Sequence, residues 1–254
     1  IVGICASGIL VRALGPLLEG KHKDSAVIAL AEDGSVAVPL IGGHHGANDL
    51  ARRIAALTGG VPAITTAGDL RFGFALDDPP PGWRVANPAM AKPVMAALLA
   101  GTAARLEGKA PWLAGAPWRD DAALGVCVTD RAGCETNRTL VLHPLVLTIG
   151  VGCERGTDPA ELATLVAASL AEAGLAAGSV AAIGSLDLKM DEPAMHQVAA
   201  ILKAPLRFFT AAELEAEAHR LLNPSEIVFR ETGCHGVAEG AALALAGTGG
   251  KLVV

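Results

Sequence analysis

Short apolar runs alternate with helix-forming segments along most of this sequence, and this alternation restricts the fold more than any other feature. Residues 1–5 have the pattern of a buried strand, and residues 9–18 form a helical pattern that ends at Gly20. Residues 25–40 are apolar on both sides of Asp33-Gly34, which is a strong signal for a β-hairpin. The pattern predicts an α/β fold.

The second half of the sequence shows the same alternation. Asp158, Pro159 and Glu161 have the residue types of a helix start, with a capping side chain, a proline in the first turn and a carboxylate that can reach back. Thr210 and Glu213 have the spacing of a capping box. Further strands are expected at 180–184, 206–209 and 251–254, and further helices at 192–203, 211–222 and 236–247.

Composition supports a core of small aliphatic side chains. Hydrophobic residues make up 52% of the chain, whereas aromatic residues make up 3% and tyrosine is absent. Such a composition suits buried parallel strands. We therefore predict two small α/β domains with strand-helix alternation, at residues 1–70 and 145–254. A less regular middle segment, residues 71–144, joins them, because "DDPPPG" interrupts the alternation there.

Charge and cysteine content exclude several classes of protein. The net charge of −6 argues against broad nucleic-acid binding, which requires a basic surface. No apolar run approaches the roughly 18 to 20 residues that a membrane-spanning helix needs. The five cysteines include no CxxC pair, so neither a disulfide framework nor a thiolate zinc site is expected. We expect a cytoplasmic protein with reduced thiols and no nucleic-acid or membrane partner.

The stretch "IGGHHGANDL" places glycines and two histidines before an expected helix at 47–57. Backbone N–H groups at a helix entrance can bind an anion, and the imidazole of His44 or His45 can transfer a proton. Alternatively, one histidine is exposed, the other is packed, and Asn48 and Asp49 only cap the helix. No metal site is expected, because adjacent side chains diverge and no third ligand has a recognisable spacing. The glycines of this candidate site are Gly42, Gly43 and Gly46.

A second polar group follows an expected strand in "VPAITTAGD". Thr65, Thr66 and Asp69 lie where the strand runs out into a polar loop, so their hydroxyl and carboxylate groups can face one cleft. Alternatively, Asp69 caps the next turn.

Three further groups of candidate residues lie in the second half. "GVGCERG" is a glycine loop in which Cys153 accompanies Arg155, a fork for carboxylates, although an ordinary tight turn has the same pattern. Asp187 and Lys189 share one face of an extended chain and can form an ion pair or contact substrate, or else belong to a solvated charge run. Glu239, one turn into the last helix, either meets a cation or faces solvent.

Together these loops resemble, in order and position, one known family. The chain is similar to the cobalt-precorrin-5A hydrolases of cobalamin biosynthesis (the CbiG family), whose C-terminal part is similar to the stand-alone CobE proteins. "GHHGAN" and "TTAGD" match the family patterns "GHxGGAN" and "TTATD", with His45 displacing a glycine and Gly68 replacing a threonine. "GVGCERG", "GSLDLKMDE" and "GVAEGAAL" match the later patterns of the family.

The resemblance implies hydrolytic opening of the ring A δ-lactone of cobalt-precorrin-5A, with release of acetaldehyde and formation of cobalt-precorrin-5B. His44 or His45 with Asp69 would then move protons, and N–H groups of Gly42–Asn48 would stabilise an oxyanion. Arg155, Lys189 and the loop of Cys153 would hold carboxylate arms of the substrate. The cobalt belongs to the substrate, so no cofactor or protein-bound metal is expected.

Other functions remain open at this point. The chain can be a non-catalytic carrier of corrinoid intermediates, like CobE, or an accessory piece of a fusion with a precorrin-3B methyltransferase. An unrelated α/β function is a third alternative, because a fold does not fix a function. Members of the family usually have residues before and after the matched part, so we expect a truncated or fused piece. A homodimer and contacts with other enzymes of the pathway also remain open.

Overall fold

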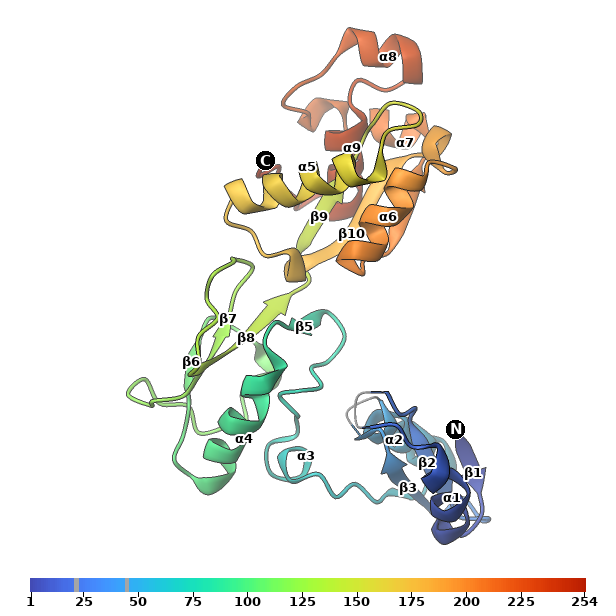
Figure 1. The fold of residues 1–254 in the computed structure, drawn as a ribbon, viewed down its shortest axis with the longest axis vertical. Helices are drawn as coiled ribbons and strands as arrows, with labels where there is room; N and C mark the ends of the chain where they lie inside the picture. Colours follow the sequence, from blue (N-terminus) through green and yellow to red (C-terminus); the bar gives the residue numbers. More distant parts are fainter. Residues whose placement is uncertain (21–22, 44–45) are drawn as a thin grey trace. The chain divides into compact units, whose positions relative to one another are not determined.

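A computed structural model describes residues 1–20, 23–43 and 46–254 of the chain. The chain forms two compact units, each built from two stretches: Ile1–Pro80 with Pro88–Gly125, and Pro81–Asn87 with Val126–Val254. Helices and strands alternate in both units, which confirms the predicted α/β class (Figure 1). The domain boundaries expected from the sequence remain a prediction.

The first unit is built on a four-stranded sheet with the order β1-β2-β3-β4. The strands β1 and β2 are parallel, β2 and β3 form the predicted antiparallel hairpin, and β4 is parallel to β3. Gly34 in the hairpin turn has a φ of 73°, which glycine adopts without strain. The elements of this unit are β1 (Val2–Ile4), α1 (Ser7–Leu14), β2 (Val27–Leu30), β3 (Val36–Ile41), α2 (Ala47–Thr58), β4 (Val61–Pro62), α3 (Ala67–Phe72), α4 (Ala91–Ala100) and β6 (Arg105–Glu107).

The helix α2 packs on this sheet through small side chains. Ala47 and Ala51 of α2 form one buried cluster with Ile28 of β2 and Ala37 of β3. Alanine allows the helix backbone to approach the sheet closely, so the start of α2 is fixed against the strands. The position of the loop before α2 depends on this packing.

Two expected elements of the first unit differ in the structure. The helix expected at 9–18 is α1, which ends at Leu14 and is followed by a 3₁₀ turn at Gly15–Leu17, since Pro16 has no N–H for an α-helical bond. The strand expected to run toward Asp69 ends at Pro62, and the expected polar loop contains the helix α3. Thr66 has an extended backbone at the N-cap position of α3, a position that favours threonine.

The second unit contains a three-stranded parallel sheet with the order β11-β10-β9. The strands β5, β8 and β7 lie side by side in a separate sheet. The elements are β5 (Trp83–Val85), β7 (Gly125–Val128), β8 (Thr139–Pro144), β9 (Leu147–Gly150), α5 (Pro159–Glu172), β10 (Val180–Leu186), α6 (Pro193–Leu202), β11 (Leu206–Phe209), α7 (Ala211–Glu215), α8 (Glu226–Thr232) and α9 (Val237–Ala246).

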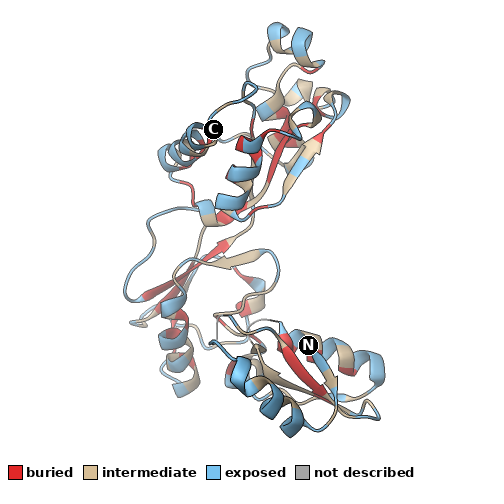
Figure 2. Cartoon of the chain, turned by 45° about the vertical axis from the view of Figure 1, so that its right-hand side comes forward, coloured by how far each residue is buried: buried red, intermediate tan, exposed pale blue. Residues whose placement is uncertain are grey.

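Helices cover both faces of the parallel sheet. Buried residues of α5 and α6 pack with Ile183 of β10 in one cluster, whereas Leu186 of β10 packs with Leu214 and Ala241 in another. In this unit the buried residues lie mainly on β8 and β10 and on parts of α5, α6 and α9 (Figure 2). The predicted caps are confirmed: Asp158 accepts a hydrogen bond from the N–H of Ala160, and Thr210 with Glu213 forms a capping box.

Two expectations for residues 211–254 are wrong, and one helix there was not expected. The helix expected at 211–222 ends at Glu215 and is followed by a 3₁₀ turn at Ala218–Arg220. The helix α8 was not expected, and its N-cap is Ser225, directly after a proline. Residues 251–254 form no strand; before them, Arg220 binds the carbonyl oxygens of Gly247 and Gly250 and holds the turn. In the described ranges no helix is long and apolar enough to cross a membrane.

The close contact between β9 and α9 gives a test of the fold. A Cβ atom on Gly150 would lie 1.7 Å from the carbonyl oxygen of Ala238, an impossible separation, whereas a Cβ atom on Gly152 would meet nothing closer than 3.6 Å. Gly150→Ala is therefore expected to lower the free energy of unfolding by about 3 kcal/mol or more, and Gly152→Ala by less than about 1 kcal/mol. Urea unfolding measures both. Equal stability of the two variants would contradict the packing of α9 on β9.

Candidate functional site

The loop before α2 requires glycine at defined positions. Gly42 has a φ of 71°, and a Cβ atom there would lie 2.9 Å from the Cα atom of Ala26. The carbonyl oxygen of Gly42 accepts a hydrogen bond from the N–H of Ala47 at 3.0 Å, which closes the loop. Gly46, with a φ of 82°, stands at the N-cap position of α2. His44 and His45, the predicted proton carriers, lie outside the described residues.

The two polar motifs of the first unit meet at the carboxylate of Asp69. Its Oδ2 atom accepts hydrogen bonds from Asn48 Nδ2 at 3.1 Å and from Thr66 Oγ1 at 2.5 Å. Asn48 Nδ2 also lies 3.0 Å from Thr66 Oγ1, and Oδ1 of Asp69 binds Nη2 of Arg52. The structure thus brings Asn48, Thr66 and Asp69 together, a meeting of the two motifs that the sequence did not indicate, and leaves Thr65, which was expected beside Thr66 and Asp69, exposed.

The surroundings of Asp69 keep its carboxylate ionised. The side chain is 8% exposed, and burial by itself raises its pKa. Hydrogen bonds from Thr66, Arg52 and Asn48, together with the charge of Arg52, outweigh burial and hold the pKa of Asp69 below its ordinary value. Asp69 is the third residue of α3 and does not cap it. It is a fixed negative charge that accepts hydrogen bonds from three side chains.

Sequence reasoning did not identify Arg52. The residue lies four positions after Asn48 on α2, so both side chains leave the same face of the helix. This spacing was the available signal, but the partner on α3 is visible only in the folded chain.

In the second unit, Arg155 is engaged by neighbouring groups. Its Nη1 atom binds both carboxylate oxygens of Asp191 at 2.8 and 3.0 Å, and its Nη2 atom donates to the carbonyl oxygen of Leu188 at 2.6 Å. The hydrogen bond and charge of Asp191 raise the pKa of Arg155, and the same contact lowers the pKa of Asp191. The N–H of Gly156 donates to the buried Glu192 at 3.1 Å. Cys153 packs at the edge of the core.

Two expectations for charged residues of this unit are corrected. Asp187 and Lys189 do not share a face, because residues Asp187–Lys189 form a 3₁₀ turn, in which positions two apart point in different directions. Glu239 neither meets a cation nor points freely into solvent. Its carboxylate accepts hydrogen bonds from the N–H groups of Leu222 and Asn223 at 2.6 and 3.2 Å, and from Asn223 Nδ2 at 2.7 Å. Glu239 therefore holds the turn before α8.

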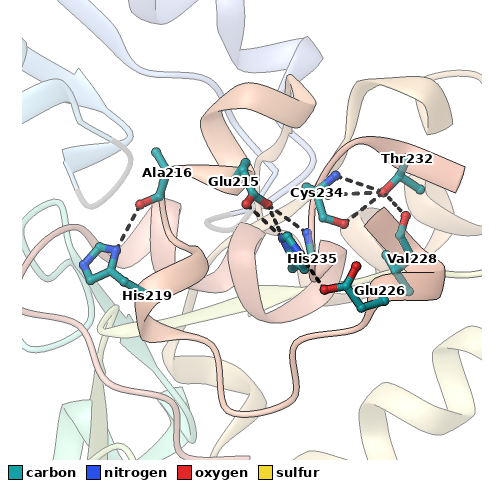
Figure 3. A network of polar contacts seen from close by, with 8 residues as sticks. All are labelled: Glu215, Ala216, His219, Glu226, Val228, Thr232, Cys234 and His235. Carbon is teal, nitrogen blue, oxygen red and sulfur yellow. Dashed lines mark hydrogen bonds and ion pairs between the residues drawn. The ribbon is translucent and has the colours of Figure 1, made fainter. Parts of the chain in front are cut away.

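A second acid–base cluster surrounds His235 in this unit (Figure 3). Nδ1 of His235 lies 2.9 Å from Glu215 Oε1, and the backbone N–H of His235 donates to Glu215 Oε2 at 2.9 Å. Nε2 lies 3.5 Å from a carboxylate oxygen of Glu226, and the ring stacks on Phe229 at 4.4 Å between centroids. The hydrogen bond that His235 donates to Glu215 and the charges of both glutamates raise the pKa of His235 despite its partial burial. In the described part of the chain, no group of three or more His, Cys, Asp or Glu residues is arranged to hold a metal ion.

Comparisons with known proteins identify the family to which this chain is similar. The family described as "Cobalamin synthesis G N-terminal" matches residues 1–69, and "Cobalamin synthesis G C-terminus" matches residues 147–254. A cobalt-precorrin-5A hydrolase of Priestia megaterium is 29% identical over 276 residues, covering 97% of this chain and 72% of that protein. Another, of Salmonella typhimurium, is 32% identical over 241 residues, covering 86% and 68%. The chain belongs to the cobalt-precorrin-5A hydrolase family.

The two clusters fall in different parts of this family. The Asp69 cluster belongs to the N-terminal region of the cobalt-precorrin-5A hydrolases. Arg155 and His235 belong to the C-terminal region, which is also similar to protein CobE of Sinorhizobium sp, at 52% identity over 108 residues, 42% of this chain and 70% of CobE. The resemblance drawn from the loop motifs is confirmed, and so is the CobE similarity of the C-terminal half.

The Asp69 cluster predicts a loss of stability on truncation. Asp69→Ala leaves the donors of Asn48, Thr66 and Arg52 without their acceptor, so we expect the free energy of unfolding to fall by about 1 to 3 kcal/mol at neutral pH. Because the pKa of Asp69 is lowered on folding, the difference from the wild type should persist above its ordinary pKa of 3.8 and fade as the pH falls below it. Chemical unfolding at several pH values measures this. The exposed Asp49, replaced by alanine, is the control, and an equal effect there would contradict the assignment.

The raised pKa of His235 predicts the opposite pH dependence. A group with a raised pKa adds stability that is fully present below its ordinary pKa of 6.5 and is lost as the pH rises through the raised value. His235→Asn keeps a donor toward Glu215 without the charge, so wild type and variant should differ most at acidic pH and converge at alkaline pH. The control is His219→Asn, because the ring of His219 contacts only a neutral group, the carbonyl oxygen of Ala216, among the contacts described. A pH-independent difference would contradict the ion pair.

Proposed function

We propose that the chain hydrolyses cobalt-precorrin-5A. Water adds to the carbonyl carbon of the ring A δ-lactone, and the bond to the lactone oxygen breaks, which gives a free carboxylate arm and a hydroxyl on the extruded carbon. That hydroxyl then loses its proton, its C–O bond becomes a carbonyl, and the C–C bond to the macrocycle breaks. The electron pair and a proton go to the macrocycle, and the products are cobalt-precorrin-5B and acetaldehyde.

The meeting of the two N-terminal motifs at Asp69 is the observation that best supports this proposal. Opening a lactone requires a base for water and donors for the oxyanion, and cleavage of the C–C bond requires a base for the hydroxyl proton. We assign the proton transfers to His44 or His45 and the oxyanion contacts to N–H groups of the loop from Gly42 to Asn48. Gly42 and Gly46 have positive φ angles, a backbone conformation that occurs in anion-binding turns.

The state of Asp69 indicates how it takes part. Its oxygens accept hydrogen bonds from three side chains and its pKa is low, so it is a poor proton carrier at neutral pH. A fixed carboxylate of this kind stabilises a neighbouring imidazolium, as in catalytic groups where a carboxylate orients a histidine. We therefore propose that the histidine moves the proton and Asp69 supplies the compensating charge.

The carboxylate arms of the substrate need cations to bind them, and the second unit supplies candidates. We propose that Arg155, Lys189 and the loop of Cys153 contact carboxylate arms, with the exposed Asp191 giving way to them. The cobalt stays part of the substrate, and we propose that no resident cofactor takes part. A cytoplasmic location, a homodimer and contacts with other pathway enzymes remain predictions.

Anaerobic incubation of the purified chain with cobalt-precorrin-5A tests the proposed function. We expect acetaldehyde in proportion to enzyme, and a mass change of the macrocycle equal to water gained and acetaldehyde lost. Tight binding without acetaldehyde would instead favour a carrier of corrinoid intermediates, a function that the CobE similarity also suits.

Single substitutions test the assignment of roles. Replacing the catalytic histidine, His44 or His45, by alanine should lower kcat by about 10²- to 10⁴-fold, the usual contribution of a positioned acid or base. Asp69→Ala should lower kcat as well, and His219→Ala in the second unit should leave it unchanged. Wild-type turnover in all of His44→Ala, His45→Ala and Asp69→Ala would refute the assignment.

A further inference from the structure

Arg52 is held in place by a buried charge. It leaves α2 on the same face as Asn48, and its Nη2 atom binds Oδ1 of Asp69. The side chain of Arg52 is 42% exposed, whereas that of Asp69 is 8% exposed. Asp69 is itself fixed by Thr66 and Asn48. One terminal nitrogen of the guanidinium is therefore anchored in the protein, while the side chain as a whole is partly exposed.

The anchored guanidinium retains donors for a ligand. A guanidinium is planar and carries five N–H groups, which form two edges where a pair of N–H groups can meet both oxygens of a carboxylate. Nη2 contributes one N–H to each edge, and the contact with Asp69 occupies one of them. Nε and Nη1 have no acceptor among the described residues. One edge is left for a second carboxylate.

Two other arginines of the chain, Arg84 and Arg220, are used differently. Both terminal nitrogens of Arg84 donate to carbonyl oxygens at the end of α6. Those of Arg220 bind Glu217 and the carbonyl oxygens of Gly247 and Gly250. In these cases the guanidinium is consumed by contacts that hold turns and helix ends. Arg52 differs from these two because a single carboxylate, only 8% exposed, orients it while its own side chain is 42% exposed.

We infer that Arg52 binds a carboxylate arm of the substrate and thereby places the macrocycle at the Asn48–Thr66–Asp69 cluster. This inference rests on the proposed function, whose substrate carries acetate and propionate arms. A charge-assisted, two-point contact of this kind fixes orientation as well as affinity. Arg52 is thus a substrate-binding residue and also a positioning residue for Asp69, and the two roles have different kinetic signatures.

Steady-state release of acetaldehyde from cobalt-precorrin-5A separates the roles. Arg52→Ala should raise KM by about 10- to 100-fold, the usual effect of losing a hydrogen bond to a charged group. Arg52→Lys, which keeps the charge but not the fork, should raise KM by a smaller factor. Arg53→Ala, the exposed neighbour on α2, is the matched control and should leave KM and kcat unchanged. Asp69→Asn breaks the ion pair but keeps the guanidinium, so it should lower kcat and raise KM by less than Arg52→Ala does.

Two results would overturn the inference. The first is an unchanged KM in Arg52→Ala. The second is an equal rise of KM in Asp69→Asn and Arg52→Ala, because Arg52 would then act only by holding Asp69 in place. If the wild type releases no acetaldehyde, the proposed hydrolysis fails, and calorimetric binding of cobalt-precorrin-5A replaces KM. Weaker binding by Arg52→Ala than by Arg53→Ala would then uphold the arginine contact on its own. Equal binding, or none by the wild type, would overturn it.

Discussion

The carboxylate of Asp69 is the interaction on which the arrangement of the first unit's polar motifs depends. The strand β4 ends at Pro62, and α3 has only six residues, too few for a helix to be stable by itself. A charge that is 8% exposed must be paired or neutralised, and the partners of Asp69 come from Thr66 and from Asn48 and Arg52 on α2. Pairing the charge thus fixes α3 against the start of α2, and with it the orientation of the Asn48 side chain.

In the second unit, contacts between the loops at one edge of the parallel sheet have a comparable role. The parallel strands β9, β10 and β11 end at the same edge of their sheet, so the segments that follow them gather there. Glu192, after β10, accepts the N–H of Gly156 in the loop after β9, and Asp191 binds Arg155 from that loop. These contacts between segments 36 residues apart hold the glycine loop where a ligand of an open sheet usually binds.

Turn and cap signals in the sequence predicted local structure well, whereas the helices expected at 9–18 and 211–222 are shorter than predicted. The hairpin at Asp33-Gly34 and the caps at Asp158 and Thr210 depend on neighbouring residues only, and they form as expected. The expectation for Glu239, whose contacts depend on residues distant in the sequence, was wrong. Glu239 was expected to meet a cation or solvent, but its acceptors are filled by Leu222 and Asn223 from a turn 16 and 17 residues away.

The same limit explains what was missed in the candidate sites. That Asn48 and Asp69 lie together follows from the packing of α2 on the sheet, which the sequence indicates only through the alanines of α2. Arg52 belongs to no recognisable motif, and its role becomes visible only through its contact with Asp69, 17 residues later. Asp187 and Lys189 were placed on one face because an extended chain was assumed, whereas a 3₁₀ turn follows β10.

The arginine–aspartate pairs of the two units differ in a way that bears on ligand exchange. A chain with a net charge of −6 that takes a substrate with several carboxylates needs local cations whose partners do not compete with the ligand. Asp191 is 75% exposed, so water can solvate it after it leaves Arg155, and exchange for another carboxylate carries little penalty. Asp69 cannot leave Arg52 in this way, since it would remain buried without its counter-ion. Arg155 can therefore change partners, whereas Arg52 can only add one.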